Sequence, residues 1–156
     1  MHTNPYATFS LPEIVAALND GVGMAVGETA LTIAEARFTW PMAGTLLRLT
    51  DPEATAAGIG QYDTLRAQIE TGYAIPELPD DGRRWTRDQV SEAVNWAVDQ
   101  GANAVRGGCA DDLDNLLVNA VMSLLDDPHA EFEDVAVENY GEEPETVSRW
   151  ARDAAA

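Results

Sequence analysis

The sequence predicts an all-α fold, a single compact domain of about six helices, from three observations. Apolar residues from Leu113 to Leu125 recur at intervals of three and four, which is typical of a helix with one face in a core. Two segments carry a capping box, in which Ser10 or Thr86 is followed three positions later by Glu or Gln. Strand patterns are scarce, since GTLLRLT at residues 44–50 is the only plausible short candidate.

The chain length and the absence of targeting signals limit the class of protein. A chain of 156 residues fits one domain with a real core. No apolar run reaches the roughly 18 residues of a membrane span, and the first residues lack the pattern of a signal peptide. We therefore expect a cytoplasmic protein. Cys109 is the single cysteine, so we expect a buried, inert thiol and no intrachain disulfide.

Three helices are predicted in the first half of the chain. The first runs over residues 11–19 and is expected to stop at Asp20-Gly21. The second covers residues 29–38 and ends before Pro41. The third covers residues 51–70. It starts at Asp51-Pro52, an Asp cap followed by Pro, and continues to Glu70 despite Gly58 and Gly60.

A Gly- and Pro-rich segment at residues 72–82 is typical of a linker. On this basis we divide the chain into an N-terminal helical part, residues 1–75, a linker, residues 76–85, and an acidic helical part, residues 86–156. We expect the two parts to form one domain.

Two further helices are predicted after this linker. One begins at the Thr86 capping box and ends at Gly101, and the other covers residues 113–125 and is stopped by Pro128. Three aspartates at the start of the second helix are explained by capping and by the helix dipole. Asp126 and Asp127 lie at its other end, where the dipole disfavours them, so this pair is a better candidate for function.

Charge is the strongest compositional signal. The chain has 27 acidic and nine basic residues, a net charge of -18, and every basic residue is Arg. Residues 107–156 form the acidic C-terminal third, with 13 acids and two arginines. Such a charge predicts a basic protein partner rather than nucleic acid. Codon usage that favours arginine over lysine, or a structural protein adapted to molar salt, would produce the same composition.

Residues 129–156 have the spacing of a helix-turn-helix. Phe132 and Val135 begin a first helix, Tyr140-Gly141 forms the turn, and a second helix follows with Val147 and Trp150 pointing inward. The pattern departs from DNA-binding examples in two places. Val137 stands where a small residue is usual, and Glu142 where an apolar residue is usual.

The charges of this tail also oppose DNA binding. Glu142, Glu143 and Glu145 begin the would-be recognition helix, whose start must face bases and phosphates, and only Arg149 and Arg152 could offset them. A DNA-binding regulator is therefore the second hypothesis. The first is a surface of carboxylates that takes the place of phosphates. Two or three adjacent helices, each rising about 1.5 Å per residue, can approach the charge density of duplex DNA, which is one charge per roughly 1.7 Å.

A resemblance supports the first hypothesis. The stretch QVSEAVNWAVDQGA, residues 89–102, resembles a helix of the phage antirestriction proteins that mimic DNA and block type I restriction enzymes. The matching positions are Gln89, Val90, Glu92, Ala93, Val94, Trp96, Ala97 and Asp99-Gln100, with shorter matches at Ala110-Asp111 and Phe132-Glu133-Asp134. The resemblance implies a helical homodimer that offers carboxylates in place of phosphates. It does not extend to the N-terminal half.

No enzyme motif is present in the sequence. His2 and His129 lie outside zinc-type spacings, and the glycines form neither a dinucleotide-binding loop nor a P-loop. The aspartates near residue 111 lack the ligand order of an EF-hand. We therefore expect no catalytic residue, no metal and no cofactor.

The sequence thus predicts a non-enzymatic acidic protein that binds a basic, nucleic-acid-binding partner such as a restriction or other defence nuclease. The predicted binding residues are Asp111, Asp112, Asp114, Asp126, Asp127, Glu131, Glu133, Asp134, Glu138, Glu142, Glu143 and Glu145.

Overall fold

A computed structural model describes residues 6–31, 37–52, 60–70 and 72–155, and these residues have the predicted all-α fold. The described part contains seven helices and two strands of three residues each. The helices are α1 (Leu11–Thr29), α3 (Thr39–Thr50), α5 (Gly60–Glu70), α6 (Arg87–Arg106), α7 (Asp112–Asp126), α8 (Phe132–Tyr140) and α9 (Pro144–Ala155). The strands are β1 (Thr8–Ser10) and β2 (Arg84–Thr86). None of these helices has the length and apolar character needed to cross a bilayer.

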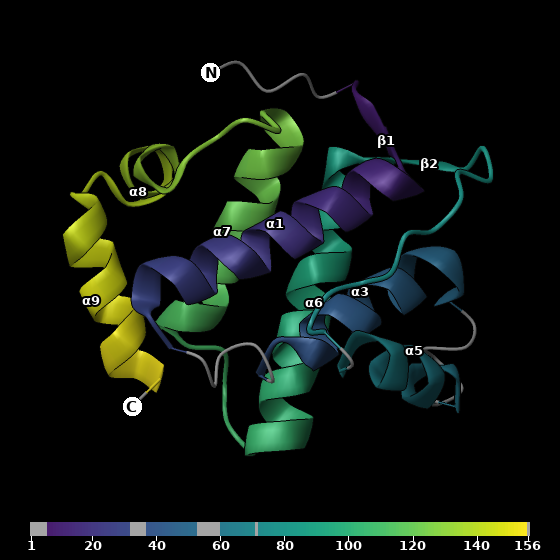
Figure 1. Cartoon of the computed structure of the whole chain (residues 1–156), viewed down its shortest axis with the longest axis horizontal. Coiled ribbons are helices and arrows are strands. Elements are labelled where there is room, and N and C mark those ends of the chain that lie inside the picture. The colour runs from purple at the N-terminus through teal and green to yellow at the C-terminus, as the bar shows by residue number, and fades with distance from the viewer. Residues whose placement is uncertain (1–5, 32–36, 53–59, 71, 156) are drawn as a thin grey trace.

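Helices α1 and α7 pack together in the middle of the molecule (Figure 1). Helix α3 packs on α6 and α5 to one side, and α8 and α9 lie on the other. One cluster of buried side chains extends from Phe9 to Ala151, so helices from both sides of residues 72–82 share a core.

Residues 72–82 are irregular, as a linker should be, but Ile75 anchors them to α1. The side-chain amide of Asn19 donates to the Ile75 carbonyl at 3.0 Å, and the Ile75 N–H donates to the Asn19 Oδ1 at 2.8 Å. The Ile75 side chain is buried. Because burial and hydrogen bonds hold its start, this segment is part of the packed molecule.

The predicted helix ends at Asp20-Gly21 and Gly101 are both wrong, because these glycines serve helix packing. A Cβ atom on Gly21 would lie 2.8 Å from the Cγ2 atom of Val121 on α7. A Cβ atom on Gly101 would lie 2.8 Å from the Cδ1 atom of Trp40 on α3. The chain therefore continues as helix through both glycines, with neighbouring elements closer than a side chain would allow.

The helix predicted over residues 29–38 does not match the described residues at its start, whereas at its end Arg37 is helical and Phe38 is the N-cap of α3. Helix α1 continues to Thr29 and is capped by Ala30 in the left-handed region, with φ 57°. Residues 32–36 lie outside the described residues. Pro41 falls in the first turn of α3, where its missing N–H costs no hydrogen bond, so it does not end a helix.

The predicted third helix ends correctly at Glu70, the last residue of α5. Its predicted start at Asp51-Pro52 agrees with Pro52, which is helical, and Asp51 is at the same time the C-cap of α3. Residues 53–59, which the prediction placed in this helix, lie outside the described residues. The strand candidate at residues 44–50 is helical within α3.

The two capping boxes are confirmed, and a small sheet that the sequence did not predict brings them together. Strands β1 and β2 are antiparallel, with Phe9 opposite Trp85, and each leads directly into a helix. Ser10 caps α1 and Thr86 caps α6. The starts of two helices that are distant in the sequence are therefore held side by side.

Candidate functional site

Two of the three aspartates at the start of α7, Asp111 and Asp114, are bound internally. Asp111 is the N-cap, and its Oδ1 accepts the N–H groups of Leu113 and Asp114 at 3.1 Å. Asp114 accepts the Asp111 N–H in return at 3.1 Å. The Arg37 guanidinium lies between the two carboxylates, 3.0 Å from the Asp114 Oδ2 and in direct contact with Asp111. These carboxylates hold the helix start against the segment that leads into α3.

Burial and charge both act on this cluster. Burial alone lowers the pKa of Arg37, but hydrogen bonds to Asp111 and Asp114 raise it more, so the pKa lies above its ordinary value. The Asp114 side chain is only 2% exposed. Asp114 is therefore not presented to a partner, which corrects the prediction for this residue, whereas the Asp111 side chain is 25% exposed and its part in binding stays a prediction.

Asp126 is also paired within the molecule, which answers why an acid stands at the disfavoured end of α7. Its carboxylate accepts from the Arg87 Nε at 2.9 Å and 3.2 Å. The Asp126 side chain is 13% exposed. The neighbouring Asp127 is the C-cap, and its Oδ1 accepts the His129 N–H at 3.0 Å. Both residues therefore have a structural role, and their part in binding stays a prediction.

Asp134 has a local role as well. Its carboxylate accepts the N–H of Glu131, the N-cap of α8, at 2.9 Å, and its side chain is half-buried. Five of the predicted binding residues thus hold helix ends or pair with arginines. The other seven are exposed.

These seven exposed carboxylates form what we call the acidic surface. They begin at the first turn of α7 and continue through α8, the α8–α9 turn and the first turn of α9. None has an arginine within 4 Å among the described residues. The members are Asp112, Glu131, Glu133, Glu138, Glu142, Glu143 and Glu145.

The two C-terminal helices have the predicted connection. Gly141 ends α8 in the left-handed region with φ 63°, and α9 starts at Pro144. Val147 is buried as predicted, but Trp150 is 37% exposed. Trp150 stands edge-on to Tyr140 with ring centroids 6.3 Å apart, and Ser148 and Ala151 take the buried positions of α9.

Tyr140 connects this pair to α7. Its hydroxyl accepts a hydrogen bond from the Asn119 side-chain amide at 2.8 Å. Burial raises the pKa of Tyr140 above 10.0, the Asn119 hydrogen bond lowers it, and the charge of Asp112 raises it. Tyr140 is therefore neutral at physiological pH and serves to position α8.

Most arginines of the described residues are paired away from the acidic surface. In the described residues, arginines 37, 48, 66, 83, 84 and 87 each lie within 4 Å of a carboxylate. Arg149 and Arg152 are exposed on α9, beyond the turn that carries the glutamates. The sequence could not reveal these pairs, because most join residues that are far apart in the chain.

Helix α1 adds one acid to this region that the sequence did not indicate. Glu28 lines a groove of about 510 Å³ together with Glu131 and Glu133. Met24 and Phe132 contribute apolar walls. The N-terminal half therefore contributes a carboxylate, that of Glu28, next to the acidic surface.

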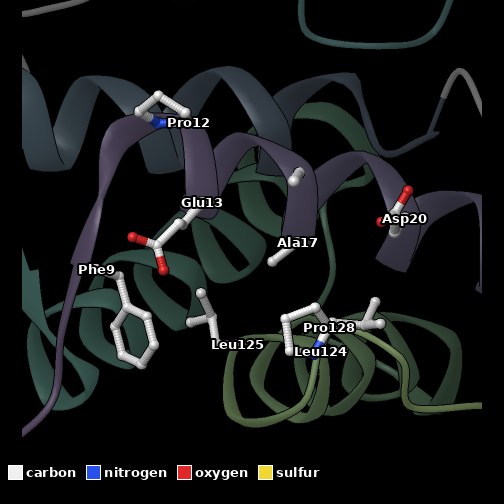
Figure 2. Close-up of a pocket in the computed structure, with 9 residues that line it drawn as sticks. Phe9, Pro12, Glu13, Ala17, Asp20, Leu124, Leu125 and Pro128 are labelled. Carbon is white, nitrogen blue, oxygen red and sulfur yellow. The ribbon is translucent and has the colours of Figure 1, made fainter. Parts of the chain in front are cut away.

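A second concave feature, the α1–α7 pocket, lies between the first half of α1 and the end of α7 (Figure 2). Its volume is about 300 Å³. Its apolar lining includes Phe9, Ala17, Leu124, Leu125 and Pro128. The carboxylates of Glu13 and Asp20 also line it. Figure 2 shows Glu13 reaching toward Phe9 and Leu125, with Asp20 further along the same helix.

Groups with potential chemistry are sparse in the described residues. Cys109 is exposed, which corrects the prediction of a buried thiol, since the loop between α6 and α7 holds it outside the core. His129 is exposed in the α7–α8 loop, and His2 lies outside the described residues. No group of three or more His, Cys, Asp or Glu side chains in the described ranges is placed to hold a metal ion.

Comparison with known proteins adds no relative. No protein-family model, curated protein or solved structure matches this chain.

Proposed function

We propose that this chain is a non-enzymatic binding protein whose acidic surface takes the place of nucleic acid on a basic protein. The partner class is a nucleic-acid-binding protein such as a restriction or other defence nuclease. The surface offers carboxylates where the partner's site receives phosphates. The resemblance of residues 89–102 to antirestriction proteins agrees with this proposal.

One observation carries the proposal: six arginines of the described residues lie within 4 Å of a carboxylate elsewhere, while the carboxylates of one region stay exposed. Arg37 and Arg87 bind acids at the two ends of α7, and the seven acids of the acidic surface face solvent. Exposed carboxylates along successive helices create a negative potential that attracts a basic groove. Carboxylates on two or three adjacent helices can together approach the charge density of duplex DNA, because a helix rises about 1.5 Å per residue and DNA carries one charge per roughly 1.7 Å.

The alternative, a DNA-binding regulator, has less support. Its recognition helix would be α9, whose start is preceded by exposed Glu142 and Glu143 and contains exposed Glu145. These carboxylates repel phosphates at the end of the helix that must approach them. Direct binding of duplex DNA at low salt would favour this alternative.

The test compares two variants of equal charge. In the surface variant, Glu138, Glu142, Glu143 and Glu145 become Gln. In the control variant, Glu77 becomes Gln, and Asp80, Asp88 and Asp99 become Asn; all eight side chains are exposed. Each variant is immobilised, incubated with lysate of the source organism at low salt, and eluted with duplex DNA.

We expect the unaltered chain and the control variant to retain a basic nucleic-acid-binding protein that DNA displaces. The surface variant should bind that protein at least about tenfold more weakly, because several exposed ion pairs are lost together. Circular dichroism should show equal helicity in all three chains. Equal binding by both variants would remove the assignment of the acidic surface, and retention of nothing that DNA displaces would remove the proposed function.

A further inference from the structure

We propose that the α1–α7 pocket receives an apolar side chain from a basic segment of the partner, with flanking cations on Glu13 and Asp20. This inference rests on the proposed function and gives the partner a more specific chemistry. It adds a second point of attachment outside the C-terminal third.

The pocket favours an apolar group because its lining is mainly hydrocarbon. Phe9 comes from β1, Ala17 from α1, and Leu124 and Leu125 from the last turn of α7, so three elements converge on it (Figure 2). Filling such a pocket removes apolar surface from water on both partners.

The two carboxylates define which kind of segment fits. Glu13 and Asp20 are seven positions apart on α1, which corresponds to roughly 10.5 Å along the helix. A polyproline II peptide has three residues per turn and advances about 3.1 Å per residue, so cations three positions apart lie on one side of it and span a similar distance. The matching segment is therefore a short polyproline II stretch with an apolar residue between two arginines or lysines.

The two carboxylates also have capacity for external cations. Asp20 is exposed, and no arginine of the described chain lies within 4 Å of it. Glu13 uses its Oε1 for Ser10, at 3.2 Å from the backbone N and 3.0 Å from the hydroxyl, and for Arg84 at 3.6 Å. The Glu13 side chain is 53% exposed, so a cation can approach its second oxygen.

The position of the pocket connects it to the acidic surface. Pro128 lines the pocket and lies in the α7–α8 loop, three residues before Glu131 of the acidic surface. A basic partner that covers α8 can therefore continue into the pocket. A second copy of this chain is a poor occupant, because each copy carries a net charge of -18 and the two repel each other.

The test uses two fluorescein-labelled hexapeptides of equal charge. Each has two arginines three positions apart, and one has a phenylalanine between them where the other has glycine. Fluorescence anisotropy at low salt measures the affinity of both peptides for the full chain. Methyl NMR of Leu124 and Leu125 reports on the location of binding.

Two variants and two matched controls identify the site. Ala16→Leu fills the pocket from an exposed position at its rim, and Ala67→Leu makes the same change on the exposed face of α5. Asp20→Asn removes one rim charge, and Asp99→Asn removes one exposed charge on α6.

We expect the phenylalanine peptide to bind at least about fivefold more tightly than the glycine peptide. Ala16→Leu should abolish this preference, and Asp20→Asn should weaken binding about threefold. Both controls should behave as the unaltered chain. Equal affinity for the two peptides, or a preference that survives Ala16→Leu, would overturn the inference, as would a dimer that Ala16→Leu dissociates in sedimentation experiments.

The same variants separate this inference from the proposed function. If a captured partner binds Ala16→Leu and Asp20→Asn normally but not the surface variant, the pocket has no role while the proposed function stands. If the peptide preference exists but lysate yields no partner that DNA displaces, the proposed function fails and the pocket's partner role fails with it.

Discussion

Arg37 and Asp114 form the most deeply buried ion pair of the described residues, with side-chain exposures of 13% and 2%. Asp114 belongs to the acid-rich third of the chain, and its ion pair with Arg37 connects that third to the segment before α3. A buried carboxylate is tolerated only when it is paired and hydrogen-bonded. Asp114 meets both conditions, through Arg37 and through the Asp111 N–H.

Replacing Arg37 with Gln should therefore lower the free energy of unfolding by about 3–5 kcal/mol, because Asp114 stays buried without a cation. Urea denaturation followed by circular dichroism measures the change. Arg66→Gln is the control, since Arg66 pairs with Glu70 on the surface of α5 with both side chains about half exposed. Its cost should be about 0.5 kcal/mol or less. Similar losses for both variants would contradict the structural role of Arg37.

Local sequence signals predict where helices form, but they do not show where two helices pack closely together. The capping boxes at Ser10 and Thr86 and the apolar period of α7 are local signals, and they correctly predicted helices. The sequence predicts helix ends at Gly21 and Gly101, because a glycine in a helix is unfavourable unless another element approaches it. That approach involves Val121 and Trp40, which are far away in the sequence.

The same limit applies to the candidate site. The high density of acids in the C-terminal third is visible in the sequence alone. Which acids are exposed and which are paired is not, because Arg37 and Asp114 are 77 positions apart and Arg87 and Asp126 are 39 apart. The apolar wall of the α1–α7 pocket likewise requires β1 and α7 to meet, which no local pattern indicates.

Two glycines of α1 provide a test of this packing. Gly23→Ala should stabilise the protein by up to about 1 kcal/mol, because the new Cβ meets nothing within 4 Å and alanine favours helix. Gly21→Ala should destabilise it by about 1–3 kcal/mol, because the new Cβ lies 2.8 Å from Val121. Thermal and urea unfolding measure both. Stabilisation by both substitutions would show that α1 and α7 do not approach each other closely.

At the scale of the whole molecule, arginine pairing makes the charge of the chain uneven. Arginines 48, 83 and 84 neutralise acids around β2, α3 and α6, whereas α8 and the turn after it keep theirs exposed. Exposed like charges raise the free energy of the folded state at low salt. A binding surface of this kind thus costs stability, and the cost should be visible without any partner.

Raising NaCl from about 20 mM to about 500 mM should therefore raise the melting temperature by roughly 3–8 °C, because salt screens repulsion among exposed carboxylates. The surface variant should respond less and should be more stable than the unaltered chain at low salt. Thermal unfolding followed by circular dichroism measures both effects. Adaptation to molar salt predicts a different result, a chain that is unfolded at the lower concentration in both forms. A melting temperature that falls with salt would contradict the account of a self-repelling acidic surface, because net attraction between charges would then stabilise the fold.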